Sequence, residues 1–357
     1  MMSRPVRVTI QSEQETARID SFEQSEVEDF LRKRYRGVRA LVTGGLGFIG
    51  SNLAKRLVSL GAAVVVVDSL EANTGGNRAN LKGHEDQIEI RELDLRRCGE
   101  VPGMFEGIQV VFNLAGRVSH IDSMVDPLLD LGSNVEAQVV LLESCRRLAP
   151  DARIVFASTR QIYGRPMSLP VNEDHPLQPV DVNGIHKMAA EAYHTLYHRV
   201  HGLKTVSLRL TNTYGPGMRI KDARLTFLGI WLRRAIEGEA FEVWGGRQQR
   251  DLTYVDDAVN AFLLAGSHPG AEGQIFNIGG GAPVTLAELA GLLIGVKGGG
   301  RYEVIEFPPE RLPIDIGNFF ADDSRFCDLT GWRRYTPLAD GLAKTLAYYQ
   351  SRLKDYV

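Results

Sequence analysis

The sequence predicts an α/β protein built on a Rossmann-type, doubly wound parallel sheet, with a smaller C-terminal α/β lobe. Three observations predict this fold. Short apolar runs alternate with stretches of helical period between residue 38 and about residue 210. A glycine-rich turn at residues 44–50 joins the first apolar run to the first helical stretch, and Asp68 ends the second run. Because such sheets bind ligands beyond the carboxyl ends of their strands, functional residues are expected there.

Six apolar runs are expected to form parallel strands. The run at 62–68 is apolar at nearly every position, as expected for a strand that helices cover on both faces. The six runs are 39–44, 62–68, 88–94, 108–115, 153–158 and 204–210. The clearest helices expected between them are 49–61, 134–148 and 186–200, each with apolar side chains at helical spacing.

The chain divides into three parts. Residues 1–37 are expected to be an N-terminal extension, in which 25–36 form a short helix that packs on the body or on a partner subunit. Residues 38–210 form the predicted sheet domain. Residues 211–357 are richer in Gly, Pro and Arg loops, and are expected to form most of a discontinuous second lobe with returns to the sheet domain.

Composition excludes several classes of protein. Lys and Arg number 41 against 44 for Asp and Glu, so the net charge of −3 does not favour binding to nucleic acid or to a membrane surface. Cys98, Cys145 and Cys327 are odd in number and far apart, which argues against a disulfide framework and against a zinc site. Without a signal-like N-terminus or a long apolar run, a cytoplasmic protein is expected.

The turn after the first strand has the features of a diphosphate site. Gly44, Gly47 and Gly50 have GxxGxxG spacing and open a helix, whose free N–H groups and positive dipole suit phosphate. Asp68 could accept both hydroxyls of a ribose and would repel a 2′-phosphate, so NAD is favoured over NADP. A strand-end cap is the alternative role for Asp68. Asp94, at the end of the third run, is placed to face the adenine edge.

Several motifs in order along the chain resemble one family. They are TGGLGFIG at 43–50, LAG at 114–116, STRQIYG at 158–164, RLTNTYGP at 209–216, RDLTYVDDAV at 250–259 and FNIGGG at 276–281. Together they resemble the extended short-chain dehydrogenase/reductase superfamily, and within it the NAD-dependent nucleotide-sugar epimerases and dehydratases, such as UDP-glucose 4-epimerase. The resemblance covers about residues 38–350. It implies a Rossmann-type NAD domain, a C-terminal lobe that binds a nucleotide-diphosphate sugar, and a homodimer.

The resemblance also implies which residues bind the cofactor. The glycine turn would carry the diphosphate, Asp68 the adenosine ribose, and Lys187 the nicotinamide ribose. The residues implied at the NAD site are Gly44, Gly47, Phe48, Ile49, Gly50, Asp68, Asp94, Leu95, Leu114, Ala115, Gly116 and Lys187.

The implied catalytic residues include one departure from the family. Ser158 and Thr159 match a Ser/Thr pair whose hydroxyl contacts the sugar oxygen that is oxidised, although both could simply close the strand end. Lys187 matches the lysine of the family's YxxxK pair, but Asn183 stands at the position of the tyrosine. An amide cannot titrate, and loss of a positioned acid/base is expected to cost about 10²–10⁴ in rate.

Three residues are weighed as the source of the missing proton. His186 is disfavoured because it points about 100° away from Lys187 on the expected helix. His120 follows a strand end and is expected to face the crevice, with a structural histidine as the equal alternative. Tyr163 lines the sugar pocket in the family, and simple packing is its alternative role. Asn183 would also fit a protein that binds its ligand without turnover, or a chain that carries a substitution at this position.

The residues after Thr159 distinguish branches of the family. The 4,6-dehydratases carry Asp and Glu there, whereas this chain has Arg160 and Gln161, which cannot act as carboxylate acid and base. A dehydratase is therefore disfavoured. Arg160 suits bidentate pairing with a carboxylate, which would admit a 4-epimerase or decarboxylase of a UDP-uronate, and a bridge to a neighbouring loop is its alternative role.

The remaining implied contacts are with the nucleotide. Asn212 and Arg250 match positions that bind the diphosphate, and Arg219 adds positive charge nearby, although a solvated loop would also carry such charge. Arg311 roughly matches a late arginine that closes on the base or ribose. No metal site or hydrolase motif is expected.

These observations favour an NAD-dependent nucleotide-sugar epimerase. It would oxidise a ring hydroxyl transiently to a ketone and return the hydride to the opposite face. The alternatives are a UDP-uronate decarboxylase, a C2-epimerase, or a non-catalytic module that binds the nucleotide or NAD because Asn183 replaces the tyrosine.

Overall fold

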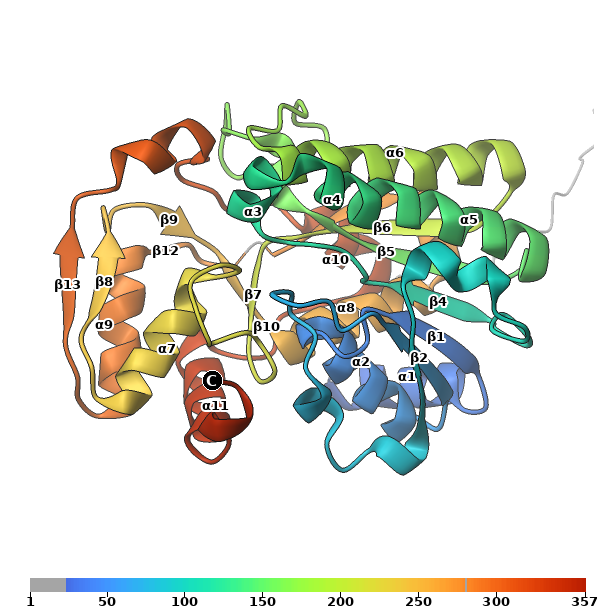
Figure 1. The fold of residues 1–357 in the computed structure, drawn as a ribbon, viewed down its shortest axis with the longest axis horizontal. Helices are drawn as coiled ribbons and strands as arrows, with labels where there is room; N and C mark the ends of the chain where they lie inside the picture. Colours follow the sequence, from blue (N-terminus) through green and yellow to red (C-terminus); the bar gives the residue numbers. More distant parts are fainter. Residues whose placement is uncertain (1–23, 280) are drawn as a thin grey trace, which may run out of the picture.

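The computed structural model describes residues 24–279 and 281–357. At its centre is a seven-stranded parallel sheet in the order β11-β6-β5-β4-β1-β2-β3 (Figure 1). Its strands are β1 (Arg39–Thr43), β2 (Ala63–Asp68), β3 (Ile88–Glu92), β4 (Val110–Asn113), β5 (Arg153–Thr159), β6 (Lys204–Leu210) and β11 (Ile275–Ile278). The predicted α/β fold class and its six strands are confirmed. The seventh strand, β11, was not predicted as a strand.

The direction of winding changes between β1 and β4. From β1 the chain builds outward through β2 to β3, then crosses back to β4 and continues through β5 and β6. Thr43 and Asn113 end the two central strands, and the Thr43 hydroxyl donates to Asn113 Oδ1 at 2.9 Å. The loops after these strands separate at this point, which is where a doubly wound sheet opens a binding crevice.

Helices cover both faces of the sheet. Alternate residues of β2 belong to two separate cores: Val64 and Val66 pack with one set of helices, and Val65 and Val67 with the other. The helices of the first face are α1 (Gln24–Tyr35), α2 (Phe48–Ser59) and α8 (Val255–Ser267). The second face carries α5 (Ala137–Leu148), α6 (Val182–His201) and a 3-10 helix (Leu95–Glu100). Burial on both faces explains why the central strands are uniformly apolar.

The predicted N-terminal helix is present as α1 and is fixed to the body. Val27, Leu31 and Tyr35 lie on its buried side, and the Tyr35 hydroxyl donates to the Leu263 carbonyl of α8 at 2.7 Å. Arg56 of α2 forms an ion pair with Glu28. This part of the extension therefore belongs to the core of the same chain.

The smaller lobe lies beside the sheet (Figure 1). It contains the parallel pair β8 (Phe241–Trp244) and β13 (Tyr302–Ile305), with α7 (Phe227–Glu237), α9 (Leu286–Lys297) and α11 (Leu338–Gln350). Short pairs join the lobe to the sheet domain: β7 (Asn212–Tyr214) with β10 (Leu252–Tyr254), and β9 (Gln249–Arg250) with β12 (Val284–Thr285). The remaining helices are α3 (His120–Val125), α4 (Pro127–Leu131) and α10 (Ser324–Thr330). Within 211–357, α8 and β11 return to the main sheet.

The described residues contain neither a candidate metal site nor a candidate membrane-spanning helix. Among 24–279 and 281–357, no three His, Cys, Asp or Glu side chains are grouped so that they could hold a metal ion. In the same residues no helix is both long and apolar enough to cross a membrane. The cysteines are free.

Candidate active site

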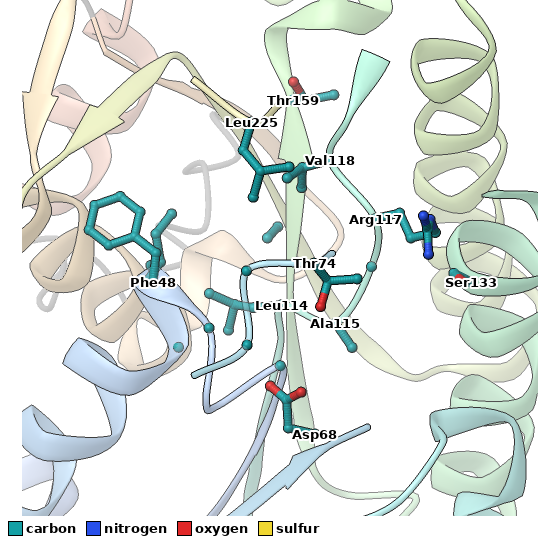
Figure 2. A pocket seen from close by; sticks show the side chains of 18 of the residues that line it. Phe48, Asp68, Thr74, Leu114, Ala115, Arg117, Val118, Ser133, Thr159 and Leu225 are labelled. Atoms are coloured by element: carbon teal, nitrogen blue, oxygen red, sulfur yellow. The ribbon is translucent and has the colours of Figure 1, made fainter. Parts of the chain in front are cut away.

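One cavity of about 800 Å³ lies at the carboxyl ends of the strands. Its walls come from the segments that follow β1 to β6 and from residues 218–226 of the smaller lobe. Figure 2 shows Asp68 at one end and Thr159 at the other, with Leu114, Ala115 and Val118 between them. A volume in the upper part of the range for ligand pockets fits an elongated ligand or two ligands side by side.

The glycine turn has no room for side chains. Gly44 has a positive φ of 67°, and a Cβ there would lie 2.8 Å from the Leu114 carbonyl oxygen. A Cβ on Gly50 would lie 2.3 Å from the Gly44 carbonyl oxygen. Gly47 caps α2 without a side-chain acceptor, so the first N–H groups of α2, beginning with Phe48 and Ile49, remain available to an anion. The turn therefore fits the diphosphate of a dinucleotide.

Asp68 lies where an adenosine ribose would follow this diphosphate. Its Oδ2 accepts the Leu46 N–H at 3.0 Å and its Oδ1 accepts the Leu70 N–H at 2.9 Å. Burial raises its pKa above the ordinary aspartate value, although these N–H groups act in the opposite direction. Each carboxylate oxygen keeps a second lone pair, so the side chain can still accept from two hydroxyls.

Asp94 lines the same end of the cavity but carries its own partner. The Arg96 guanidinium contacts both carboxylate oxygens, with its Nη2 2.5 Å from Oδ2, and this pairing lowers the Asp94 pKa. Leu95 adds an apolar surface beside the pair. Because the positive charge of Arg96 is already paired, neither residue offers a free cation to a 2′-phosphate.

Leu114, Ala115 and Gly116 form the floor between the two ends. The Leu114 and Ala115 N–H groups donate to the Thr43 hydroxyl at 3.2 Å. Gly116 has a φ of 155°, and a Cβ there would lie 3.2 Å from Lys187 Nζ. The backbone at Gly116 therefore lies close to the ammonium group of Lys187.

Lys187 is buried beneath the cavity. Its Nζ donates to the Ala157 carbonyl at 3.2 Å. Burial lowers its pKa to about 8, against the opposing influence of Asp130. The ammonium group is still the main form at neutral pH and can donate to a ribose hydroxyl.

Ser158 and Thr159 differ in what their hydroxyls can do. Ser158 donates to Glu191 Oε2 at 2.6 Å, and Glu191 is paired with Arg209 in the interior. Its proton is therefore committed away from the cavity. The Thr159 hydroxyl accepts the Gln161 N–H at 3.2 Å and keeps its own hydrogen for donation. Of the predicted pair, Thr159 is therefore the residue whose hydroxyl hydrogen is not committed to a protein group.

Asn183 is buried with its amide hydrogens already used. Its Nδ2 donates to the Arg117 carbonyl at 2.8 Å and to Asp130 Oδ2 at 3.2 Å. Both partners are acceptors, which fixes the orientation of the amide. Its carbonyl oxygen is thereby left for the cavity, whose wall Asn183 forms in part. The residue at the tyrosine position is an acceptor that cannot titrate.

His120 reaches the cavity from the first residue of α3. Its Nδ1 lies 2.9 Å from Asp181 Oδ2. Gln161 donates from Nε2 to the same carboxylate oxygen at 2.8 Å. The structure therefore brings His120 and the turn after Thr159 together through Asp181.

Arg160 lines the cavity on the side of the smaller lobe. Its Nη2 donates to Asn212 Oδ1 at 3.0 Å, and its guanidinium lies over the Phe319 ring. Nη1 is inaccessible to solvent and has no hydrogen-bond partner among the described residues. Burial, together with the nearby charge of Arg250, lowers its pKa to about 9, so it stays charged at neutral pH.

Arg219 also lines the cavity, with its charge already in use. It pairs with Asp222 at 2.6 Å and donates to the Thr74 carbonyl at 2.9 Å. Two sides of the Arg219 guanidinium are thus held by protein groups. Because Asp222 balances its charge, Arg219 adds less positive charge to the cavity than the sequence suggested.

Three predicted site residues lie outside the cavity lining. Tyr163 is fully buried, where its hydroxyl donates to Asn277 Oδ1 and accepts from Arg209, both at 2.7 Å. Arg250 donates to the Gly317 carbonyl. Arg311 packs over the Trp244 ring. The Tyr163 hydroxyl and one Arg250 nitrogen are thus occupied by protein groups, and the roles of all three residues toward a ligand stay predictions.

Comparison with known proteins identifies the family. The model of the NAD dependent epimerase/dehydratase family matches residues 40–279, well over half of the chain. The chain belongs to this family. Within it are NAD-dependent nucleotide-sugar epimerases, dehydratases and decarboxylases, which fits a cavity that continues from a dinucleotide turn to a sugar end.

Similar proteins in the family have different named activities. UDP-glucose 4-epimerase of Mycolicibacterium smegmatis is 32% identical over 321 residues, covering 88% of this chain and 99% of the relative. UDP-glucuronic acid decarboxylase 1 of Danio rerio is 30% identical over 332 residues, covering 91% and 75%. The solved UDP-glucose 4-epimerase of Thermotoga maritima with UDP-glucose has a TM-score of 0.80 and 30% identity, covering 88% and 100%. The residues of the site must therefore distinguish the activities.

Two buried carboxylates beside the cavity, Asp130 and Asp181, were not predicted from the sequence. Asp130 accepts from Asn134, Asn183 and His186, and Asp181 holds His120. Both acids occur in loops or short helices without a motif. The available signal was the position of Asp181 two residues before Asn183, where an N-cap residue is expected.

Proposed function

We propose that the protein is an NAD-dependent nucleotide-sugar epimerase. The observation that carries this proposal is the single cavity that runs from Asp68 and the glycine turn to Thr159 and Lys187. NAD bound along that turn would accept a hydride from a ring carbon and return it. An epimerisation consumes no reductant, which suits a cofactor held deep in one cavity.

The chain's own residues have distinct roles in this proposal. Asp68 accepts from the adenosine ribose, and Lys187 donates to the ribose nearer the reacting carbon. Thr159 donates to the sugar oxygen, where a neutral hydroxyl stabilises developing negative charge. Asn183 offers its carbonyl oxygen to a second hydroxyl of the ligand.

The residues after Thr159 argue against elimination of water. A 4,6-dehydratase needs an acid and a base beside the sugar. Here Arg160 is held by Asn212, and Gln161 is held by Asp181. Neither can exchange a proton with a sugar carbon.

A uronate substrate is the second candidate. The guanidinium of Arg160 supports it, because this charged group lines the cavity and a sugar carboxylate would be a charge-assisted acceptor for it. Either a 4-epimerase or a decarboxylase of a UDP-uronate would place a carboxylate here.

The surface of α3, α4 and α6 supports a homodimer. Large apolar side chains are exposed along these neighbouring helices, which Figure 1 shows together at one side of the sheet. They are Met124, Val125, Leu128, Leu129, Leu131, Ile185, Tyr193, Leu196 and Val200. A second copy of the chain would cover such a face.

Two measurements test the proposed function together. Mass spectrometry of the small molecules released by denaturing the purified protein is expected to detect NAD rather than NADP. Incubation with UDP-glucose, UDP-galactose and UDP-glucuronate, followed by chromatography of the products, is expected to show inversion at a ring carbon. Pentose formation from UDP-glucuronate identifies the decarboxylase instead. Failure to find or bind a dinucleotide contradicts both enzymes.

Removal of the Thr159 hydroxyl tests its assigned role. Thr159→Val keeps the shape of the side chain but removes the donor, and kcat is expected to fall by about 10²-fold or more while nucleotide affinity changes little. Thr195→Val, on α6 outside the cavity lining, is the matched control. Unchanged kcat in the Thr159 variant contradicts the assignment.

A further inference from the structure

A histidine and a buried aspartate form a pair at the sugar end of the cavity. His120 Nδ1 lies 2.9 Å from Asp181 Oδ2. The Asp181 side chain is 0% exposed, whereas that of His120 is 38% exposed and lines the cavity. Nδ1 is buried and faces the Asp181 carboxylate closely, although the contact lacks the alignment of a hydrogen bond. The opposite edge of the ring carries Nε2, and the ring as a whole lines the cavity. A carboxylate behind the ring and a free Nε2 in front is the arrangement of an acid/base histidine.

The pair is fixed by the helices on which it stands. Ser119 caps α3 by accepting the Asp122 N–H at 3.2 Å, which sets the direction of His120 as the first helical residue. Asp181 caps α6 in turn, where its Oδ1 accepts the Gly184 N–H at 2.6 Å. One carboxylate therefore positions both the imidazole and the start of the helix that carries the family lysine.

The second oxygen of Asp181 also ties the pair to the sugar-binding turn. Gln161 donates to Oδ2 at 2.8 Å, and its own N–H donates to the Thr159 hydroxyl. Burial raises the Asp181 pKa, but the contacts with His120, Gly184 and Gln161 outweigh burial, and the pKa lies below its ordinary value. A carboxylate 2.9 Å from Nδ1 favours a hydrogen on that nitrogen, which would leave Nε2 as the acceptor of the ring.

The other groups near the cavity are less suited to move this proton. Both Asn183 amide hydrogens are committed to Arg117 and Asp130. His186 directs its Nδ1 to Asp130 at 2.7 Å and lies outside the cavity lining. Tyr163 is also outside it, and burial raises the Tyr163 pKa to about 12.

We propose that His120 is the acid/base of the reaction and that Asp181 is its positioning residue. The inference rests on the proposed function and deepens it. As the sugar hydroxyl is oxidised, its O–H bond breaks and the proton passes to His120 Nε2. Bound NAD would supply the hydride acceptor, so that loss of the C–H and O–H bonds of this carbon would leave a C=O bond, and the hydride would return to the opposite face. In the return step His120 gives the proton back to the oxygen, so nothing is consumed.

Substitution of His120 tests the proposal in the full-length protein loaded with NAD. His120→Gln is expected to lower kcat by about 10²–10⁴-fold. KM and NAD content are expected to stay within about threefold of wild type, because the family's binding residues are unchanged. His201→Gln is the matched control, since His201 is exposed at the end of α6 and lies outside the cavity lining. Its kcat is expected to equal that of wild type.

Rescue by a small molecule separates chemistry from structure. His120→Ala leaves space for free imidazole, and addition of imidazole is expected to restore part of kcat in this variant but to have no effect on wild type. Asp181→Asn keeps an acceptor for the helix cap but removes the negative charge behind the ring. It is expected to lower kcat by about tenfold or more with little change in KM or in unfolding temperature.

The outcomes distinguish this inference from the proposed function. If wild type converts no nucleotide sugar, the proposed function fails and the inference fails with it. If wild type is active and His120→Gln keeps kcat within about threefold, the inference alone is overturned. Loss of kcat in His120→Ala without rescue, accompanied by a lower unfolding temperature, also overturns it, because the ring would then be only structural.

Discussion

Asn183 stands where the sequence resemblance implies a tyrosine, and the structure shows how its amide is held. The amide at this position is buried, and both of its hydrogens are held by the Arg117 carbonyl and by Asp130, so that its orientation is fixed and its oxygen is left for the cavity. The position therefore fits a binding role, and the titrating group must come from elsewhere in the cavity.

Lys187 provides a pH-dependent prediction at the same scale. Because burial lowers its pKa to about 8, the free protein loses the donor ammonium as the pH rises through that value. NAD affinity is expected to weaken by up to about tenfold between pH 7 and pH 9, since only the protonated fraction is competent. Calorimetric titration of the cofactor-free protein at several pH values measures this. Lys187→Met should bind weakly at every pH, and an equally steep pH dependence in that variant would assign the titration to another group.

Single-residue roles were predictable where they depend on local backbone. Gly44 follows β1 directly, Asp68 ends β2 and Gly50 lies in the first turn of α2, so their positions relative to the strands place them in the cavity. Roles that depend on distant partners were not predictable. Tyr163 was assigned to the cavity from its motif, but Asn277, 114 residues away, takes its hydroxyl into the core.

At the scale of elements, the turn between β1 and α2 tolerates few added atoms. Gly44, Gly47 and Gly50 approach backbone rather than flexible side chains, so a clash there cannot be relieved by a rotamer change. The same close approach brings the N-terminus of α2 toward the cavity. Geometry at this turn and cofactor binding are therefore expected to change together.

Gly50→Ala tests this link. The new Cβ would lie 2.3 Å from the Gly44 carbonyl oxygen, so the turn must shift. Dinucleotide affinity is expected to fall by at least about tenfold, and stability to fall by about 1–3 kcal/mol. Gly295→Ala is the matched control, because Gly295 lies in α9 with nothing within 4 Å of its added Cβ. It should bind NAD normally and be slightly more stable. Normal affinity in Gly50→Ala contradicts a diphosphate at this turn.

The strands were easier to predict than the short helices. The inner strands are apolar runs that pack between two layers of helices, and such runs have a clear pattern. β11 has only four residues, and α3 and α4 are short helices between β4 and α5, too short for a period to be visible. Yet α3 contributes His120, so a helix that carries the inferred chemistry was not predicted from the sequence.

At the scale of the whole molecule, the cavity is made by segments that the chain sequence separates widely. Residues 44–50 and 218–226 line it together, and the pairing of β7 with β10 joins the lobe to the sheet domain beside it. The shape of a cavity assembled in this way depends on the positions of the helices around it. The exposed apolar face of α3, α4 and α6 begins at the same helices that carry His120, Asn183 and Lys187, so assembly and activity are expected to be linked.

Leu196→Glu tests assembly through this face. Leu196 is 48% exposed on α6, and a charge placed on the face would be buried without a partner in a dimer. Sedimentation is expected to show a dimer for wild type and mainly monomer for this variant. Val304→Glu on β13 is the matched control, since Val304 is 50% exposed on the far side of the smaller lobe (Figure 1) and its variant should stay dimeric. Wild type that sediments as a monomer at all concentrations contradicts the dimer. If the helices beside the cavity need the partner, the monomeric variant should also lose kcat, whereas equal kcat per chain would show that each cavity is complete on its own.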